Sequence, residues 1–234
     1  MAQQLQERTT AQQHHKGYRG LGMEGRVAHW YTRNTGRDLT DYHRDARRIA
    51  ERTPAGGRVL DLAPGPGYVA MEVARLGEYQ VVGLDISETF VQIASERASA
   101  AGVEVDFQRG DAAHMPFADG SFDFVFCRAA FKKFSDPVGA LREIHRVLRP
   151  GGTGLIVDLH KDVPRKTLDR EVTQIIQRNG LGWLDALMTR LTFQFVLIPR
   201  AYRWVDFERM AKAAQLPHHE IREDGITLEV WITK

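Results

Sequence analysis

The sequence predicts an α/β fold: a doubly wound, mostly parallel sheet with helices on both faces. Short apolar runs with strand character recur at residues 58–63, 79–85, 103–109, 122–127 and 153–159. Segments with helical periodicity separate most of them, and this alternation is typical of parallel strands joined by crossover helices. Two further strand-like runs, 218–224 and 226–233, surround Gly225. Because the turn between them is so short, we expect an antiparallel hairpin at the sheet edge.

Start and stop signals define the helices between these strands. Residues 68–76 have a helical pattern, and Gly77 is expected to end that helix in a left-handed conformation. Ser87 is expected to cap a helix that runs to about residue 101, because its hydroxyl can accept a backbone N–H. Pro137 follows Asp136 at the position that proline prefers, the first residue of a helix.

The remaining segments predict further helices. Residues 41–52 form an amphipathic pattern with Thr40 or Asp41 as the expected N-cap. After the run at 153–159, helical patterns follow at 164–179, 183–198 and 204–215. The segment 183–198 is the most apolar in the chain. It is predicted either to pack into the core or to form a wall over a binding pocket.

Composition indicates a globular protein with balanced charge. The chain has 234 residues and a net charge of +2, so it can bury a sizeable core and gives no reason to expect nucleic acid or an anionic membrane as a partner. Cys127 is the only cysteine, which excludes an intrachain disulfide and fits a reducing compartment. The sequence has no apolar stretch of membrane-spanning length, no signal-peptide pattern and no metal-ligand spacing, so we expect a cytoplasmic protein without a metal.

A glycine-rich loop interrupts the apolar pattern after the first strand. It reads APGPG (63–67), follows Asp61 on the strand, and has Asp85 20 residues beyond its first glycine. This spacing fits the fingerprint of a dinucleotide-binding loop. Pro64 and Pro66, however, lack the backbone N–H groups that a pyrophosphate would need, and the Asp61 carboxylate would repel a diphosphate. The loop therefore favours a ligand with a cationic amino group.

Five segments, taken in order, resemble motifs of the class I S-adenosylmethionine-dependent methyltransferases. They are DLAPGPG (61–67), VGLDIS (82–87), GDAAHMPF (110–117), FDFVFCR (122–128) and LREIHRVLRPGG (141–152). The similarity covers about residues 38–160. It implies a seven-stranded Rossmann-like sheet, S-adenosyl-L-methionine as cofactor, and methyl transfer to a small, partly apolar or aromatic acceptor. The candidate partners are that acceptor and a second copy of the chain.

The resemblance also assigns residues to the cofactor. Asp61 would face its methionyl part, and Asp85 would accept both ribose hydroxyls. Ile86 and Met115 would enclose the adenine, with Asp111 on its exocyclic amine. The full expected set is Tyr31, Asp61, Ala63, Pro64, Gly65, Gly67, Asp85, Ile86, Asp111, Ala112, Met115, Cys127 and Arg128.

Candidate catalytic residues lie mainly outside these motifs. Asp158 and His160, two positions apart near a strand end, are candidates for taking a proton from the acceptor, and Tyr31 is a third. Alternatively, alignment of acceptor, methyl group and sulfur suffices without a base. The expected acceptor pocket includes Phe131, Leu191 and Phe195.

The chain departs from the family pattern at two places. Ala63 stands where the family usually has glycine, which adds a methyl group to the loop. Relatives often have histidines where this chain has Lys132 and Lys133, and we interpret these lysines as a solvated pair. We expect residues 1–37 to be a partly disordered extension that covers the cofactor, and 38–234 to be one methyltransferase domain with a helical insertion at about 161–198.

Two other functions remain open at this point. An NAD(P)-dependent oxidoreductase could use the same glycine pattern, although the loop prolines and the Asp111 motif argue against it. A non-catalytic S-adenosylmethionine-binding regulatory protein would keep the binding motifs and lack the transfer reaction.

Overall fold

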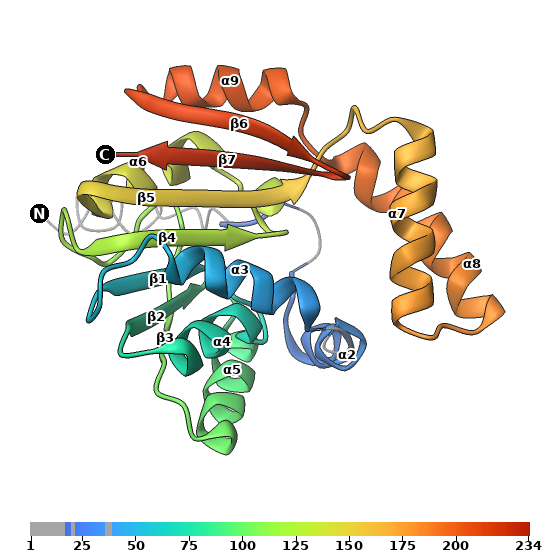
Figure 1. The fold of residues 1–234 in the computed structure, drawn as a ribbon, viewed down its shortest axis with the longest axis horizontal. Coiled ribbons are helices and arrows are strands. Elements are labelled where there is room, and N and C mark those ends of the chain that lie inside the picture. Colours follow the sequence, from blue (N-terminus) through green and yellow to red (C-terminus); the bar gives the residue numbers. More distant parts are fainter. Residues whose placement is uncertain (1–16, 20–21, 36–38) are drawn as a thin grey trace, which may run out of the picture.

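One seven-stranded sheet organises the protein (Figure 1). The computed structural model describes residues 17–19, 22–35 and 39–234. Its strands run in the spatial order β3-β2-β1-β4-β5-β7-β6, with β7 antiparallel to both neighbours and the other pairs parallel. The bounds are β1 Arg58–Leu62, β2 Gln80–Asp85, β3 Asp106–Arg109, β4 Phe122–Arg128, β5 Leu148–Leu159, β6 His218–Asp224 and β7 Thr227–Thr233. The predicted fold class, including the edge hairpin, is confirmed.

Helices cover both faces of this sheet. They are α2 Gly25–Thr35, α3 Thr40–Ala50, α4 Tyr68–Leu76, α5 Glu88–Ala101, α6 Pro137–Val147, α7 Arg165–Arg178, α8 Trp183–Thr192 and α9 Trp204–Ala213. Side chains of α3 and α4 share one hydrophobic cluster with the sheet, and those of α6 and α9 share another on the opposite face. In β4, Phe124 and Phe126 join the first cluster, whereas Val125 and Cys127 join the second. The alternation explains why this strand is apolar throughout.

Most of the helix signals hold, and two do not. Ser87 caps α5, its hydroxyl accepting the Phe90 N–H at 3.1 Å, and Gly102 ends that helix with φ 65°. The predicted cap of α3 is wrong, because Leu39 occupies the N-cap and makes no side-chain cap. Gly77 is also not left-handed; its φ of 171° is extended backbone.

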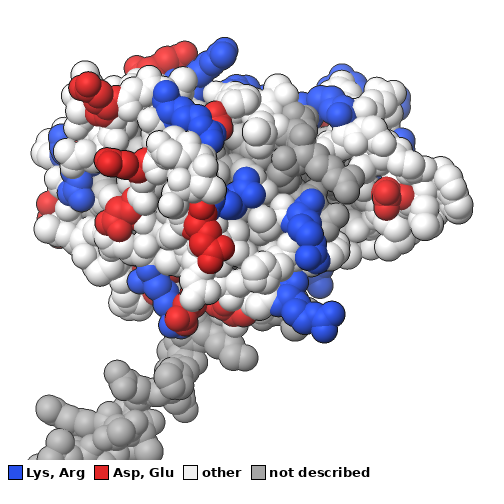
Figure 2. Space-filling model, turned by 90° about the horizontal axis from the view of Figure 1, so that it is seen from below, with Lys and Arg blue, Asp and Glu red and all other residues white. Residues whose placement is uncertain are grey.

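The insertion after β5 forms an arm of α7 and α8 at the right of Figure 1. A π-helical turn, Phe193–Leu197, continues α8, and a 3₁₀ turn, Ile198–Arg200, follows it. Large apolar residues of α8 and of the turn after it are exposed, Trp183 by 80% and Phe195 by 64% of their surface, whereas Val172 and Ile176 of α7 are buried. In Figure 2 this end of the molecule is largely white, whereas charges of both signs mix over the rest of that face. Within the described parts of the chain, no helix is both long and apolar enough to cross a bilayer.

Candidate cofactor-binding site

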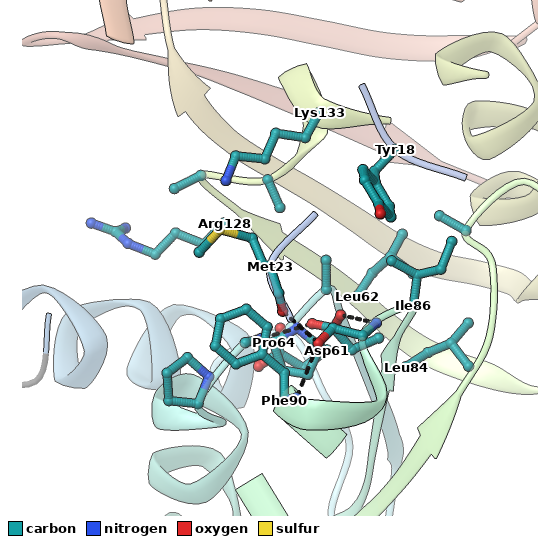
Figure 3. A pocket seen from close by; sticks show the side chains of 18 of the residues that line it. Tyr18, Met23, Asp61, Leu62, Pro64, Leu84, Ile86, Phe90, Arg128 and Lys133 are labelled. Atoms are coloured by element: carbon teal, nitrogen blue, oxygen red, sulfur yellow. Dashed lines mark hydrogen bonds between the residues drawn. The ribbon is translucent and has the colours of Figure 1, made fainter. Parts of the chain in front are cut away.

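A cavity opens at the carboxyl ends of β1, β2 and β4 (Figure 3). In the sheet, β1 has β2 as its neighbour on one side and β4 on the other. From β1 the chain first adds strands on the β2 side and then crosses to add them on the β4 side, so the strand order reverses here. Such switch points are where open α/β sheets bind ligands, because the loops diverge there. The cavity walls come from the N-terminal stretch, the loop after β1, the end of β2, the turn at Gly110–Ala112 and the segment after β4.

Two buried carboxylates form one side of the cavity. Asp61 is 3% exposed, and its Oδ2 accepts the Ala70 N–H at 3.1 Å. Asp85 accepts the Gly65 N–H at 3.0 Å on Oδ2 and the Ser87 N–H at 2.9 Å on Oδ1. Burial raises the pKa of Asp61 to about 7 and that of Asp85 to about 6. A ligand that donates hydrogen bonds or carries positive charge would stabilise the ionised form of both carboxylates, which burial disfavours.

The glycine loop has a strained backbone that opens toward the cavity. Ala63 has φ 57°, an uncommon value for a residue with a Cβ atom. Gly65, with φ 54°, has open space where a Cβ atom would stand. At Gly67, with φ 80°, a Cβ would lie 2.7 Å from the Phe107 ring. Gly65 therefore leaves room for a ligand, and Gly67 allows close packing of loop and sheet.

Within residues 17–19, Gly17 and Tyr18 line the cavity. Tyr18 forms an isolated bridge with Phe134, and the Arg19 N–H donates to the Lys133 carbonyl at 2.6 Å. A Cβ on Gly17 would lie 2.3 Å from Ile86 Cδ1 and 2.7 Å from Asp111 Oδ2. The stretch therefore packs directly against the side of the cavity where the adenine was expected.

The end of β4 and the segment after it bring cations to the cavity. Arg128 pairs with Asp45 and, at 3.3 Å, with Asp41 on α3. Lys132 turns away from the cavity and makes a buried ion pair with Asp158, with 2.6 Å between Nζ and Oδ1. Lys133 lines the cavity. The interpretation of the two lysines as a solvated pair is therefore wrong.

The structure brings most of the expected cofactor residues together. The cavity is lined by Tyr31, Asp61, Ala63, Pro64, Gly65, Asp85, Ile86, Asp111, Ala112 and Arg128. Three expected residues are not part of its lining. Gly67 is the N-cap of α4 and packs on Phe107. Met115 is a core residue with 5% exposure, and Cys127 is buried within β4. Tyr31 packs its ring edge-on against Phe90, with 5.9 Å between centroids.

The candidate bases other than Tyr31 lie outside the cavity lining. His160 is 1% exposed, and neither ring nitrogen has a hydrogen-bond partner in the described chain. Asp158 accepts the Lys132 N–H at 2.9 Å besides its ion pair with that side chain. Both residues are enclosed by the fold, so the structure does not bring them into the cavity lining.

The expected acceptor residues also lie elsewhere. Phe131 is fully buried and stacks on Phe207 in the core, with 5.3 Å between ring centroids. Leu191 and Phe195 are on the outer arm and are exposed. Sequence reasoning instead missed Tyr18 and Lys133, which do line the cavity. Lys133 belongs to the segment that departs from the family's histidines, and that departure was the available signal.

Topology and site together define a Rossmann-like fold with a cavity at its switch point. A family model described as "Methyltransferase domain" matches residues 60–156. The demethylmenaquinone methyltransferase of Deinococcus radiodurans is 30% identical over 175 residues, covering 74% of this chain and 72% of that protein. The chain therefore belongs to the class I S-adenosylmethionine-dependent methyltransferases.

Other similarities are narrower. The 2-phytyl-1,4-naphtoquinone methyltransferase of Synechococcus elongatus is 36% identical over 140 residues, covering 57% of this chain and 59% of that protein. This chain matches about three fifths of the length of the first curated relatives. A solved structure from Methanococcus maripaludis has a TM-score of 0.69 at 20% identity, covering 92% of this chain and 95% of that one. That likeness shows the fold alone.

Proposed function

We propose that this chain transfers the methyl group of S-adenosyl-L-methionine to a small, partly aromatic acceptor. The observation that carries the proposal is the pair of buried carboxylates beside a proline-interrupted loop at the switch point. Asp61 and Asp85 each hold one or two backbone N–H groups, and a carboxylate has about four acceptor positions. Both therefore keep acceptor capacity toward the cavity.

The cofactor's donor groups fit these acceptors. Its ribose hydroxyls would bond to Asp85 and its methionyl ammonium would lie near Asp61, where positive charge favours the ionised carboxylate. The adenine would lie by Ile86 and Asp111, and Tyr31 would cover the methionyl end. The open space at Gly65 gives the cofactor room against the loop. The N-terminal stretch 17–19, which packs on Ile86 and Asp111, supports the proposal that residues 1–37 cover the cofactor.

The bound cofactor supplies an activated methyl group on a sulfonium. The chain's own part is to align the acceptor with that methyl group and to exclude water. Buried Asp158 and His160 take no part in this proposal, so alignment is the main catalytic device. Tyr31 is the remaining candidate for contact with the acceptor. Burial raises the pKa of its hydroxyl, so it keeps its proton at neutral pH and can orient the acceptor as a donor.

The acceptor class follows from the relatives and from the cavity. Curated relatives are named as methyltransferases of demethylmenaquinone and of a phytyl naphthoquinone. Around Ala130, Phe134 and Tyr18 the cavity wall is apolar or aromatic. We therefore propose an aromatic acceptor of naphthoquinol type.

Location and assembly complete the proposal. The single cysteine fits a reducing, cytoplasmic compartment. The exposed apolar face of α8 supports a homodimer, because a patch of this kind is typical of association surfaces. Light scattering coupled to gel filtration tests it: a dimer that Leu187→Glu makes monomeric is expected, and a monomeric wild type would contradict it.

The transfer reaction is tested with methyl-labelled S-adenosyl-L-methionine and reduced naphthoquinones that lack the ring methyl group. The expected product is a labelled naphthoquinol together with S-adenosyl-L-homocysteine in equal amounts. An oxidoreductase would instead consume NAD(P)H with a quinone. A regulatory protein would bind the cofactor and give no labelled product from these quinols or from a metabolite extract.

A further inference from the structure

Among the described residues that line the cavity, Lys133 is the cation whose side chain has no direct ion pair or hydrogen bond. Its amine extends toward the cavity from the turn after β4, on the side that also carries Tyr18 (Figure 3). Among the described residues, none makes a hydrogen bond or an ion pair with this ammonium. Arg128, which shares the wall, is held by Asp45 and Asp41.

The neighbouring lysine shows that the fold can match such a charge where it has a structural role. The Lys132 ammonium lies 2.6 Å from Asp158 Oδ1 and 2.7 Å from the Ala129 carbonyl. Lys133 has no comparable direct acceptors. Burial, followed by repulsion from Lys132, lowers its pKa, and attraction to the Asp158 and Asp85 carboxylates opposes this only in part. A half-buried ammonium without a counter-ion is costly for the fold. An anionic group on a bound ligand would remove that cost.

The position of Lys133 separates it from the acceptors proposed for the cofactor. Asp61, Pro64 and Phe90 lie together at one side of the cavity in Figure 3, and Lys133 lies at the other. Ala130 and Phe134, close to it in the sequence, also line the cavity. These form the apolar wall to which the aromatic acceptor was assigned.

We propose that the Lys133 ammonium binds an ionised oxygen on the acceptor, so that the acceptor class is an aromatic phenolate or enolate rather than a neutral ring. This inference rests on the proposed function. The acceptor hydroxyl releases its proton to solvent, and Lys133 stabilises the resulting oxyanion. As the bond from the acceptor to the methyl carbon forms, the carbon–sulfur bond breaks and its electron pair stays on sulfur. Acceptor and sulfonium thus become methylated acceptor, neutral thioether and one proton.

A matched pair of probes tests this assignment. At neutral pH 2-hydroxy-1,4-naphthoquinone is an anion, whereas 2-methyl-1,4-naphthoquinone is neutral and of nearly the same size. Their affinities are measured by quenching of tryptophan fluorescence, with and without saturating S-adenosyl-L-homocysteine. The variants are Lys133→Met and Lys133→Arg, with Lys212→Met, an exposed lysine on α9, as the matched control.

Wild type and Lys212→Met should bind the anion about tenfold more tightly than the neutral quinone, as expected for one charge-assisted hydrogen bond. Lys133→Met should lose this preference while its affinity for the neutral quinone stays the same, and Lys133→Arg should keep part of it. Equal affinities in the wild type, or a preference that survives in Lys133→Met, would overturn the proposal.

The cofactor provides a separate control. If Lys133 instead binds the cofactor carboxylate, Lys133→Met lowers the affinity for S-adenosyl-L-homocysteine. The affinity for 5′-methylthioadenosine, which lacks that carboxylate, then stays unchanged. That result overturns the assignment to the acceptor. If wild type binds no S-adenosyl-L-homocysteine at all, the proposed function fails, and the quinone preference still decides whether Lys133 recognises an anion.

Discussion

Replacing Asp85 by alanine is the sharpest test of the cofactor site. The carboxylate is 6% exposed and holds the Gly65 and Ser87 N–H groups at 3.0 and 2.9 Å. Its proposed bonds to the two ribose hydroxyls are charge-assisted and together contribute about 1.5–3 kcal/mol. Their loss corresponds to a roughly tenfold to hundredfold weaker affinity for S-adenosyl-L-homocysteine.

We expect the Asp85→Ala protein to fold, so a lower affinity would not be caused by unfolding. Burial raises the pKa of Asp85 from 3.8 to about 6, so the unfolded state holds this carboxylate in its charged form more readily. Above pH 6 the group therefore costs the folded state about 3 kcal/mol, at 1.36 kcal/mol for each pH unit. Asp85→Ala removes that cost, which offsets the two backbone bonds it also loses.

Calorimetry at pH 8 measures the affinities. Asp85→Ala should bind adenosine and S-adenosyl-L-homocysteine with lower affinity than the wild type does. Its affinity for adenine, which has no ribose, should equal that of the wild type. Asp106→Ala, an exposed aspartate on neighbouring β3, serves as the control and should change neither. A folded Asp85→Ala protein with S-adenosyl-L-homocysteine affinity within twofold of wild type would refute the assignment of the ribose.

Three further variants test the rest of the site. Burial raises the pKa of Asp61 from 3.8 to about 7, so the contribution of this carboxyl to stability should fall as pH rises from 4 to 7. Asp61→Asn should therefore be more stable than wild type by up to about 4 kcal/mol in urea at pH 8, with no gain at pH 4. An equal gain at both pH values would contradict this. Ala63→Gly removes the cost of a left-handed residue with a Cβ atom, about 1–2 kcal/mol, and adds about 0.5–1 kcal/mol because glycine loses more chain entropy on folding. The thermal midpoint of this variant should therefore equal or exceed that of the wild type, and a clear fall would refute the strain. His160→Leu removes two unpaired buried nitrogens, and it should gain about 1 kcal/mol with unchanged turnover, whereas a hundredfold slower enzyme would restore His160 as a base.

Much of the fold was predictable because local signals and the sheet agree. The apolar runs, the Ser87 cap and Pro137 at the start of α6 all specify structure through near neighbours in the sequence. The cofactor residues Asp61, Asp85 and Asp111 could be predicted equally well, because each lies at or just after the carboxyl end of a strand, and parallel strands bring those ends together.

The acceptor side could not be predicted in the same way. Whether Lys132 or Lys133 faces the cavity depends on Asp158, which is 26 residues away in the sequence and adjacent only in the fold. Helical periodicity predicted an apolar face for 183–198 but could not predict what that face contacts. In the structure, this face is exposed. His160 follows a strand whose end is covered by Tyr202 and Ile226, a burial that no local pattern encodes.

The most direct test of the central claim is a calorimetric titration of the wild-type chain with S-adenosyl-L-homocysteine and, separately, with NAD and NADP. The account predicts one S-adenosyl-L-homocysteine site with a dissociation constant in the micromolar range and no comparable binding of either dinucleotide. Tight binding of NAD or NADP, with none of S-adenosyl-L-homocysteine, would contradict it.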